Sequence, residues 1–334
     1  MKNITDIIRN HLHKNYLIKP DSTVQTYSEL ANFAENIADG LLQTDISSII
    51  IEKPENMMPA ILACWRKNII PAILEPQIRQ EKFDAIKKVT GIKYVISDCL
   101  SEKVFCSEQI IDIRKIDHTG KKEIGELNIS ESSPALLLFT SGSTGIPKCV
   151  PLSINNIRAN IESFSGILGI SENDIFLSTS PLFYAHALYN SFLFALFLGG
   201  TVVYNGVLNL MNTTGAISLA NKHRATVYHL TPSMMQIILM MAGRLKEPFP
   251  KFRHIICGTA KLEPELKKKF ETAFNCIVTQ QYGMTETLFI SVNADKQTEL
   301  LQSVGIPVAC EIRITDPSGK TAPAGESGDI AVKS

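Results

Sequence analysis

Short apolar runs alternate with longer amphipathic segments along most of this sequence, and this alternation constrains the fold more than any other feature. Residues 47–54 and 93–98 have the length and apolar character of strands, whereas residues 57–68 between them have helical spacing. Later runs of strand length lie at residues 135–139, 174–180, 200–204, 225–230, 254–257 and 276–280. Amphipathic segments at 155–168 and 262–274 separate some of these runs. The pattern predicts βαβ units and an α/β fold with mainly parallel sheets flanked by helices.

The last stretch of the chain has a different pattern. Residues 304–334 form short alternating runs broken by glycine and proline, which is typical of antiparallel strands joined by turns. We therefore expect a small antiparallel β element after the parallel sheets. Because the chain stops directly after one of these predicted strands, we also expect that it is cut within a fold.

Charge and cysteine content argue against several functions. Lys and Arg together number 33, as do Asp and Glu, so no global field favours nucleic acid or an anionic membrane. The seven cysteines are dispersed without a C-x-x-C pair, which indicates reduced thiols rather than a disulfide framework or a zinc site. The most apolar stretch, residues 192–204, contains two glycines and is too short to span a bilayer. We expect a cytoplasmic protein with no nucleic-acid partner and no membrane span.

Five of the predicted strands end in loops of small, hydroxylated or glycine residues. These loops are residues 140–148, 178–187, 230–233, 257–260 and 281–287. Each one alone is typical of an ordinary turn. In open parallel sheets, however, ligands bind beyond the carboxyl ends of the strands, so the convergence of five such loops indicates a binding site.

The most informative of these loops is TSGSTGIPK, residues 140–148. Its glycines let backbone N–H groups approach a polyphosphate, its hydroxyls can donate to phosphate oxygens, and Lys148 supplies a cation. The loop is not a Walker motif, because Pro147 precedes Lys148 and Cys149 follows it. A surface loop with a solvated lysine is the alternative interpretation of this composition.

TSGSTGIPK and the later YGMTET (residues 282–287) together resemble the phosphate loop and the adenylate-binding motif of the adenylate-forming superfamily. That superfamily includes acyl- and aryl-CoA synthetases, luciferases and the adenylation domains of peptide synthetases. Weaker similarity extends over nearly the whole chain. Residues 26–42 resemble the N-terminal helix of the family, residues 60–76 the αβ unit that follows, and residues 303–314 the start of its β subdomain.

The resemblance implies a domain organisation. Residues 1–300 would form a large N-terminal core of two stacked α/β subdomains, and residues 301–334 would begin the β subdomain. The C-terminal lid of the family would be absent, together with its catalytic lysine and the aspartate that holds the ribose hydroxyls. The resemblance therefore implies an AMP-forming acid–thiol ligase similar to acyl-CoA synthetases. Because it would be incomplete here, we expect weak adenylation and no thioester formation.

The resemblance also implies roles for individual residues. ATP would be bound by Thr140, Ser141, Gly142, Ser143, Thr144, Gly145, Lys148, Gly258, Thr259, Ala260, Tyr282, Gly283 and Thr285. Lys148, Thr285 and Glu286 would be catalytic, with Glu286 binding Mg²⁺ directly or through water. Such groups lower the barrier to attack of a carboxylate anion on the α-phosphorus. The alternative for Thr285 and Glu286 is a helix N-terminus, where Thr and Glu are favoured.

The acid-binding side is implied by a segment similar to the family's Pro-Leu-Phe-His. Tyr184 takes the usual histidine position and is expected to gate the acyl channel, while His186 either points into the pocket or caps a helix. His229 is a further candidate for the pocket, with a buried core histidine as the alternative. Ala185 stands where amino-acid-activating relatives typically place an aspartate. Because an ammonium group would then be uncompensated, a fatty or aryl acid is favoured over an amino acid.

The implied partners are a carboxylic acid substrate and a thiol acceptor, either coenzyme A or a carrier protein. The sequence does not decide between these acceptors. Two other functions stay open, namely a non-catalytic nucleotide-binding module and a scaffold derived from the same fold. A module would bind ATP without exchanging pyrophosphate, and a scaffold would bind neither ATP nor AMP.

Overall fold

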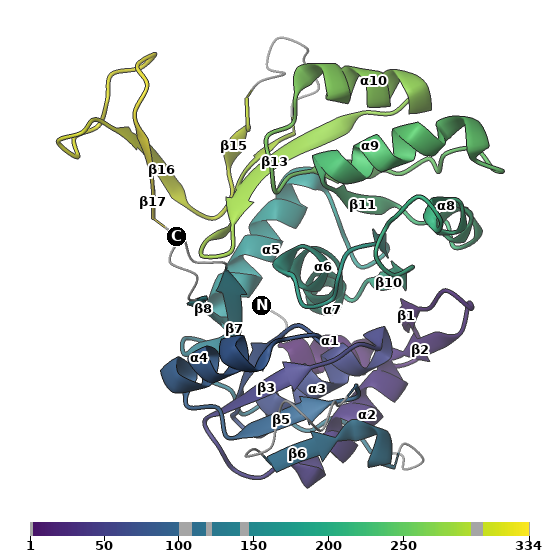
Figure 1. Cartoon of the computed structure of the whole chain (residues 1–334), viewed down its shortest axis with the longest axis vertical. Helices are drawn as coiled ribbons and strands as arrows, with labels where there is room; N and C mark the ends of the chain where they lie inside the picture. Colours follow the sequence, from purple (N-terminus) through teal and green to yellow (C-terminus); the bar gives the residue numbers. More distant parts are fainter. Residues whose placement is uncertain (1–2, 100–108, 118–121, 141–146, 295–302, 334) are drawn as a thin grey trace.

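The computed structural model describes residues 3–99, 109–117, 122–140, 147–294 and 303–333, which form three sheets (Figure 1). A six-stranded sheet lies in the lower half of Figure 1, a nine-stranded sheet lies above it, and a two-stranded ribbon projects to one side. The predicted α/β fold with mainly parallel sheets and a small antiparallel element is confirmed. No helix in the described ranges is both long and apolar enough to cross a membrane.

The six-stranded sheet is parallel except at one edge. Its spatial order is β6 (Gln109–Asp112), β5 (Tyr94–Ser97), β3 (Ile46–Ile50), β4 (Ile70–Ile73), β7 (Pro134–Thr140) and β8 (Lys148–Ser153). Helices α2 (Tyr27–Gly40) and α3 (Pro54–Arg66) belong to the core on one face, and α4 (Gln80–Thr90) belongs to a separate core on the other. β7 and β8 pair antiparallel, with Thr140 directly opposite Lys148. This hairpin brings the two ends of the predicted phosphate loop together.

The nine-stranded sheet has a parallel centre and antiparallel edges. Its spatial order is β15 (Ile306–Pro307), β14 (Leu288–Asn293), β13 (Val278–Met284), β12 (His254–Cys257), β11 (Val227–Leu230), β9 (Ile175–Ser178), β10 (Thr201–Tyr204), β1 (Asn15–Ile18) and β2 (Val24–Thr26). The strands from β13 to β1 are all parallel, whereas β14, β15 and β2 are antiparallel to their neighbours.

Helices cover both faces of this sheet. One face packs against α8 (Thr213–Lys222), α9 (Pro232–Met241) and α10 (Pro264–Phe274). The other packs against α5 (Ile154–Leu168), the π-helix η2 (Leu188–Leu193) and α7 (Phe194–Leu198). The shorter helical elements are α1 (Ile4–Asn10), α6 (Ala185–Ala187), and the 3₁₀ turns η1 (Ile113–Lys115) and η3 (Ala242–Arg244).

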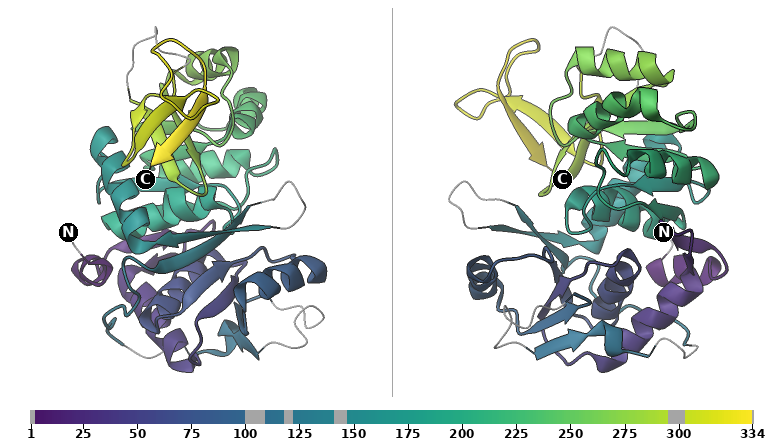
Figure 2. Two further views of the ribbon diagram at one scale, coloured as in Figure 1. Left: turned by 90° about the vertical axis from the view of Figure 1, so that its left-hand side faces the viewer. Right: turned by 45° about the vertical axis from the view of Figure 1, so that its right-hand side comes forward.

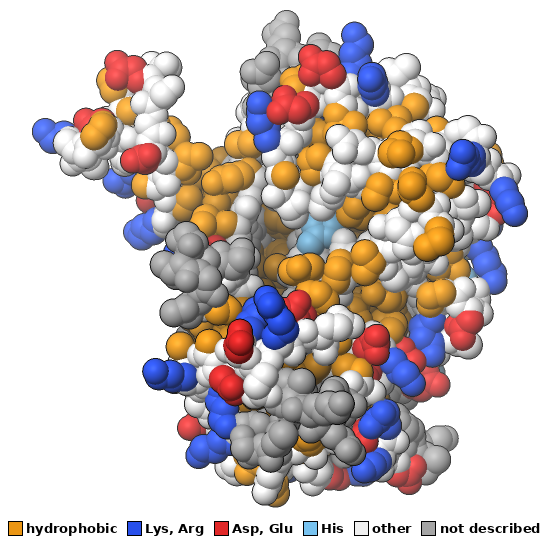
Figure 3. Space-filling view, in the orientation of Figure 1, with side chains coloured by type: hydrophobic (Ala, Val, Ile, Leu, Met, Phe, Trp, Pro, Cys, Tyr) orange, Lys and Arg blue, Asp and Glu red, His pale blue; other side chains and the backbone are white. Residues whose placement is uncertain are grey.

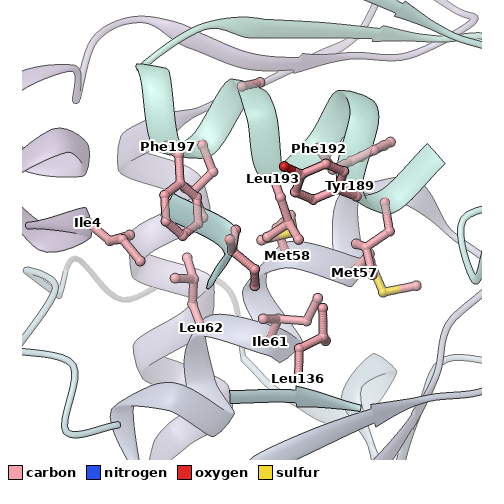
Figure 4. Packing of buried hydrophobic residues seen from close by; sticks show 14 of the residues in the cluster. Ile4, Met57, Met58, Ile61, Leu62, Leu136, Tyr189, Phe192, Leu193 and Phe197 are labelled. Carbon is pink, nitrogen blue, oxygen red and sulfur yellow. The ribbon is translucent and has the colours of Figure 1, made fainter. Parts of the chain in front are cut away.

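A large hydrophobic core joins the two sheets. Figure 4 shows side chains of η2 and α7 meeting side chains of α3 and β7, among them Tyr189, Phe192, Leu193, Phe197, Met57, Met58, Ile61, Leu62 and Leu136. Trp65 of α3 is fully buried and donates its indole N–H to the Ala135 carbonyl of β7 at 2.6 Å. Because this contact area is apolar and continuous, it stabilises one position of the β7–β8 edge relative to the nine-stranded sheet.

β13 differs from its prediction. Residues 281–284 were expected in a loop, but they continue the strand because β14 pairs with them, Gln281 opposite Val292 and Tyr282 opposite Ser291. Thr285 and Glu286 then form the hairpin turn between β13 and β14, so the alternative of a helix N-terminus at these residues is wrong.

The end of the chain is divided between two sheets. β15 extends the nine-stranded sheet, whereas β16 (Glu311–Thr315) and β17 (Asp329–Lys333) form the two-stranded antiparallel ribbon. The right-hand view in Figure 2 shows this ribbon, in yellow, standing out from the rest of the molecule. The domain division between residues 300 and 301 stays a prediction.

Candidate functional site

Two adjoining cavities lie at the carboxyl ends of β12 and β13. The first has a volume of about 460 Å³ and is lined by Thr259, Ala260, Lys261, Leu262, Glu263, Pro264, Gln280, Gln281, Tyr282, Gly283 and Val304. The second has a volume of about 380 Å³ and is lined by Thr140, Ala185, His186, Tyr189, Asn190, Thr259, Gln281, Gly283, Met284, Thr285, Glu286, Leu288 and Phe289. Figure 3 shows a hollow at the centre of one face of the molecule, with hydrophobic side chains around it. Both volumes are in the usual range of small-molecule sites.

Backbone conformation shapes the wall that the two cavities share. Thr259 follows β12 with a φ of 70°, a left-handed conformation that is uncommon for a residue with a side chain. Gly258 precedes it, and a Cβ placed there would collide with the Gln281 amide. The absence of a side chain at Gly258 therefore leaves room for the Gln281 side chain beside the end of β12.

The β13–β14 hairpin carries the residues of the YGMTET motif. A Cβ on Gly283 would collide with the backbone carbonyl of Leu288, so only glycine fits this close approach of the two strands. The Thr287 N–H donates to the Met284 carbonyl at 3.2 Å and closes the turn. The turn therefore presents Thr285 and Glu286 to the second cavity.

One of the phosphate-loop candidates, Thr140, lies in the wall of the same cavity, whereas Lys148 lines neither cavity. Thr140, at the end of β7, lines the second cavity together with Thr285 and Glu286. Lys148 is the residue directly opposite Thr140 in the β7–β8 pair, and its side chain is exposed. The other candidates, Ser141, Gly142, Ser143, Thr144 and Gly145, lie outside the described residues.

The candidates for the adenine side also lie together. The first cavity is lined by Thr259, Ala260, Tyr282 and Gly283. Gly258 lies next to the side chain of Gln281, a residue that lines both cavities. Members of both groups of nucleotide-binding candidates thus line two adjoining cavities, although more than a hundred residues separate them in the sequence.

His186 lines the second cavity and does not cap a helix with its side chain. The N-cap residue of α6 is Tyr184, and His186 lies within that helix. The Nδ1 atom of His186 is 2.9 Å from Ser180 Oγ. Burial lowers the pKa of His186 from 6.5 to about 4, and a hydrogen bond to the Leu230 backbone opposes this shift. The imidazole is therefore neutral near pH 7 and adds no positive charge to the cavity.

The two remaining acid-side candidates lie elsewhere. His229 is 4% exposed and stacks on Phe289 with ring centroids 5.9 Å apart, so it is a core histidine behind the cavity wall. Its pKa is lowered by burial first and by the neighbouring His186 and His254 next. Tyr184 is 56% exposed, contacts Phe183, and lines neither cavity.

Several residues of the second cavity were not predicted from the sequence. Tyr189 and Asn190 come from the π-helix η2, an element often found at functional sites. Behind them Asn160 of α5 donates to the Phe289 carbonyl at 2.7 Å and accepts the Phe289 N–H at 3.1 Å. Tyr189 donates its hydroxyl to the same Asn160 oxygen at 2.7 Å. The available signal was a polar residue, Asn160, among the apolar residues Ile157, Ile161 and Phe164 of the helix at 155–168.

The donor groups of the second cavity fit a magnesium nucleotide. Mg²⁺ is usually held by one or two carboxylates together with phosphate oxygens and water, and not by a dedicated protein cage. Glu286 supplies one carboxylate, with the hydroxyl-bearing Thr140 and Thr285 in the same wall. In the described part of the chain there is no group of three or more His, Cys, Asp or Glu that could hold a metal.

Comparison with known proteins gives the family. A family model described as AMP-binding enzyme matches residues 6–334. The chain is 28% identical over 330 residues to a 2-succinylbenzoate–CoA ligase of Bacillus subtilis, an alignment that covers 95% of this chain and 65% of that protein. It is 31% identical over 203 residues to an oxalate–CoA ligase of Arabidopsis thaliana, covering 60% of this chain and 39% of that protein.

The solved structures agree with the fold. The O-succinylbenzoate coenzyme A synthetase of Bacillus subtilis, in complex with ATP and magnesium ion, matches with a TM-score of 0.87 and 24% identity. The match covers 100% of this chain and 70% of that one. This chain thus spans about 65% of the length of the curated Bacillus subtilis ligase that it matches.

Proposed function

We propose, because this chain belongs to the AMP-binding enzyme family, that it activates a carboxylic acid with ATP and Mg²⁺ to form an acyl-adenylate. The acyl group would then pass to a thiol, either of coenzyme A or of a carrier protein. One observation carries the proposal. Thr140, Thr285 and Glu286 line one cavity, and this cavity adjoins a second one lined by Tyr282 and Ala260.

The names of the relatives support this reaction class. Two of them are CoA ligases, for 2-succinylbenzoate and for oxalate. A structural neighbour carries a phenylalanyl-adenylate on a protein described as A-PCP. The acceptor of this chain is therefore proposed only as a thiol. The acid is proposed to be fatty or aryl, since Ala185 offers no carboxylate for an ammonium group.

The residues of the cavities would have distinct tasks in adenylation. Lys148 and the hydroxyl of Thr140 would hold the β- and γ-phosphates, Thr285 would contact the α-phosphate, and Glu286 would hold Mg²⁺. Bound Mg²⁺ supplies positive charge that neutralises phosphate oxygens. Two anions, the carboxylate and the α-phosphate, must approach each other, so positioning and charge compensation lower the barrier without a protein nucleophile.

The remaining candidates have supporting tasks. Tyr282 and the segment Gly258–Ala260 would enclose the adenine, and neutral His186 would form part of the acid-side wall. Tyr184 is proposed to gate the channel from its exposed position beside Phe183. A cytoplasmic location is part of the proposal, and the described cysteines, which form no disulfides, are compatible with a reducing compartment.

The test is acid-dependent exchange of labelled pyrophosphate into ATP. It is measured with the 334-residue chain and with any longer product of its gene, across fatty, aryl and amino acids. We expect exchange with at least one fatty or aryl acid, and loss of that exchange in Glu286→Gln. Binding of ATP without exchange in either protein would instead indicate a nucleotide-binding module. Absence of ATP and AMP binding by the folded protein would refute the proposal.

A further inference from the structure

The loop between β10 and α8, residues 205–212, uses its polar side chains to bind its own backbone. Asn209 Oδ1 accepts from the N–H groups of Met211 at 2.8 Å and Asn212 at 3.1 Å. Asn212 in turn accepts from the Asn209 N–H and donates its side-chain amide to the Val207 carbonyl, both at 2.8 Å. Asparagine side chains that bond to nearby backbone in this way fix the conformation of a turn.

The apolar side chains of the same loop face the solvent. Met211 is 93% exposed, Val207 is 49% exposed and Leu210 is 48% exposed. The loop is anchored through buried Leu208, whose N–H donates to the Thr179 carbonyl at 2.9 Å. A single exposed apolar residue is ordinary, but three on one fixed loop form a surface that suits an apolar partner. Val207, Leu210 and Met211 are called the apolar loop below.

The neighbouring helix α9 is also apolar on its outer side. Helices α8 and α9 pack against each other, and both contribute to one core cluster, for example through Leu219 and Ile238. α9 contains no charged residue, and its Met240 is 68% exposed. Methionine is flexible and adapts to irregular apolar surroundings. Figure 3 shows hydrophobic side chains gathered to the right of the hollow, where Figure 1 draws α8 and α9.

The charged residues of this part of the chain are all basic. Between Asp174 and Glu247 the sequence contains no Asp or Glu, whereas 33 of the 334 residues of the whole chain are acidic. The same stretch contains four Lys and Arg residues, all exposed, which are Lys222, Arg224, Arg244 and Lys246. They lie at the ends of α8 and α9 or just beyond them. An apolar surface is thus combined with positive charge.

Two carboxylates from other segments approach the basic residues. Glu247 accepts hydrogen bonds from Ser218 and Asn221 of α8. Asp21 is next to Ser22, whose hydroxyl accepts from Lys222 Nζ at 2.7 Å. Both contacts involve the second half of α8, whereas the apolar loop precedes the first turn of this helix. The two carboxylates therefore reduce the positive charge without reversing its sign.

We propose that the apolar loop and the outer sides of α8 and α9 dock on an anionic lipid surface. The apolar side chains would enter the headgroup region, and the four basic residues would attract anionic lipids. A fluid bilayer accepts a projecting side chain such as Met211 anywhere on its surface, whereas a protein partner needs a matching pocket for it. This docking does not depend on adenylation.

The experiment is flotation of the 334-residue chain with lipid vesicles. One set contains phosphatidylcholine alone, and the other contains about one quarter phosphatidylglycerol, which is anionic. We expect the chain to float with the anionic vesicles at low ionic strength. Its partition coefficient should fall by about tenfold or more with neutral vesicles, and also in high salt, because both changes weaken the attraction of the basic residues.

The apolar contribution is tested with the double variant Leu210→Ser and Met211→Ser. Its partition coefficient on anionic vesicles should fall by about tenfold, because two side chains no longer leave water. Thermal unfolding verifies that the variant is folded. Val89→Ser is the control, since Val89 is 67% exposed on α4, a helix of the other sheet, and should change partitioning by less than about twofold.

The charge contribution is tested with the double variant Arg244→Gln and Lys246→Gln. Its partitioning to anionic vesicles should weaken by about tenfold, and its partitioning to neutral vesicles should stay within about twofold. Lys88→Gln with Lys93→Gln is the matched control, because both lysines are exposed in α4 or just after it. This control should float like the wild type.

Three results would overturn the inference. In the first, the folded wild type fails to float with anionic vesicles, which would assign the surface to an acidic protein instead. In the second, the serine variant floats like the wild type. In the third, the α4 controls lose as much partitioning as the variants of the proposed surface. Absence of pyrophosphate exchange refutes the proposed function alone and leaves this inference standing.

Discussion

Lys148 opens β8 directly opposite Thr140, which lines the same cavity as Glu286. We expect Lys148→Ala to weaken ATP binding by about tenfold or more, because a charge-assisted contact contributes about 1.5–3 kcal/mol. AMP binding should change by less than about twofold, since AMP lacks the β- and γ-phosphates. Titration calorimetry measures both, with Lys148→Arg as the control that keeps the charge. Equal losses for the two nucleotides would contradict the placement of Lys148.

His186 gives a prediction for stability against pH. Its pKa is about 4 in the folded chain, against 6.5 as its ordinary value, so the unfolded chain binds more protons between these pH values. The free energy of unfolding should therefore fall as the pH drops from 6.5 towards 4. Between pH 7.5 and pH 5 this single group should lower it by about 2 kcal/mol.

The check is urea unfolding of the wild type and of His186→Gln at these two pH values. The variant should lose less stability on acidification than the wild type, by about the same 2 kcal/mol. Other titrating groups act in both proteins and largely cancel in the difference. If the two proteins lose stability in parallel, the imidazole is not held neutral by its surroundings.

At the scale of elements, Asn160 connects α5 to the hairpin that carries Glu286. Its amide exchanges two hydrogen bonds with the Phe289 backbone and receives a third from Tyr189. Asn160→Ala should lower the free energy of unfolding by about 2–4 kcal/mol, because it leaves these buried groups unpaired. Urea unfolding measures this loss. Asn155→Ala, at an exposed position of the same helix, should stay within about 0.5 kcal/mol of the wild type.

Gly283 permits the close pairing of β13 and β14. Because a Cβ there would meet backbone and not a movable side chain, Gly283→Ala should destabilise the chain by about 1–3 kcal/mol and weaken ATP binding. Gly215→Ala is the matched control, since Gly215 lies in α8 with open space around it, and alanine should there be neutral or stabilising. Thermal unfolding and ATP titration of both variants are the measurements. Similar behaviour of the two variants would argue against a steric requirement at Gly283.

Elements with strong periodicity could be predicted from the sequence alone. The apolar runs at 254–257 and 200–204 form β12 and β10, and the amphipathic segment at 155–168 forms most of α5. β13 extends beyond its apolar run because its last residues, Gln281 to Met284, are held by pairing with β14. A prediction from the local sequence pattern takes no account of a pairing strand such as β14, and these residues were therefore expected in a loop.

At the scale of the whole molecule, the short continuous sequence motifs correctly indicated which residues lie near one another. Thr259, Tyr282 and Glu286 stand in short motifs, and the structure brings them to two adjoining cavities. Asn160 was missed, because its importance depends on how α5 and β14 pack against each other. Tyr184 was expected at the acid channel, but it is exposed and lines neither cavity, since α6 begins just after it and turns the chain. Its gating role stays a prediction.

The central claim is that one magnesium nucleotide spans the two cavities, with Glu286 holding the ion. The most direct measurement is titration of ATP into wild type and Glu286→Gln, each with Mg²⁺ and with EDTA. We predict one ATP per chain, tighter binding with Mg²⁺ in the wild type, and a loss in Glu286→Gln that appears with Mg²⁺ and vanishes in EDTA. Equal ATP affinity of the wild type in the two conditions, or an equal loss in the variant with and without Mg²⁺, would contradict the claim.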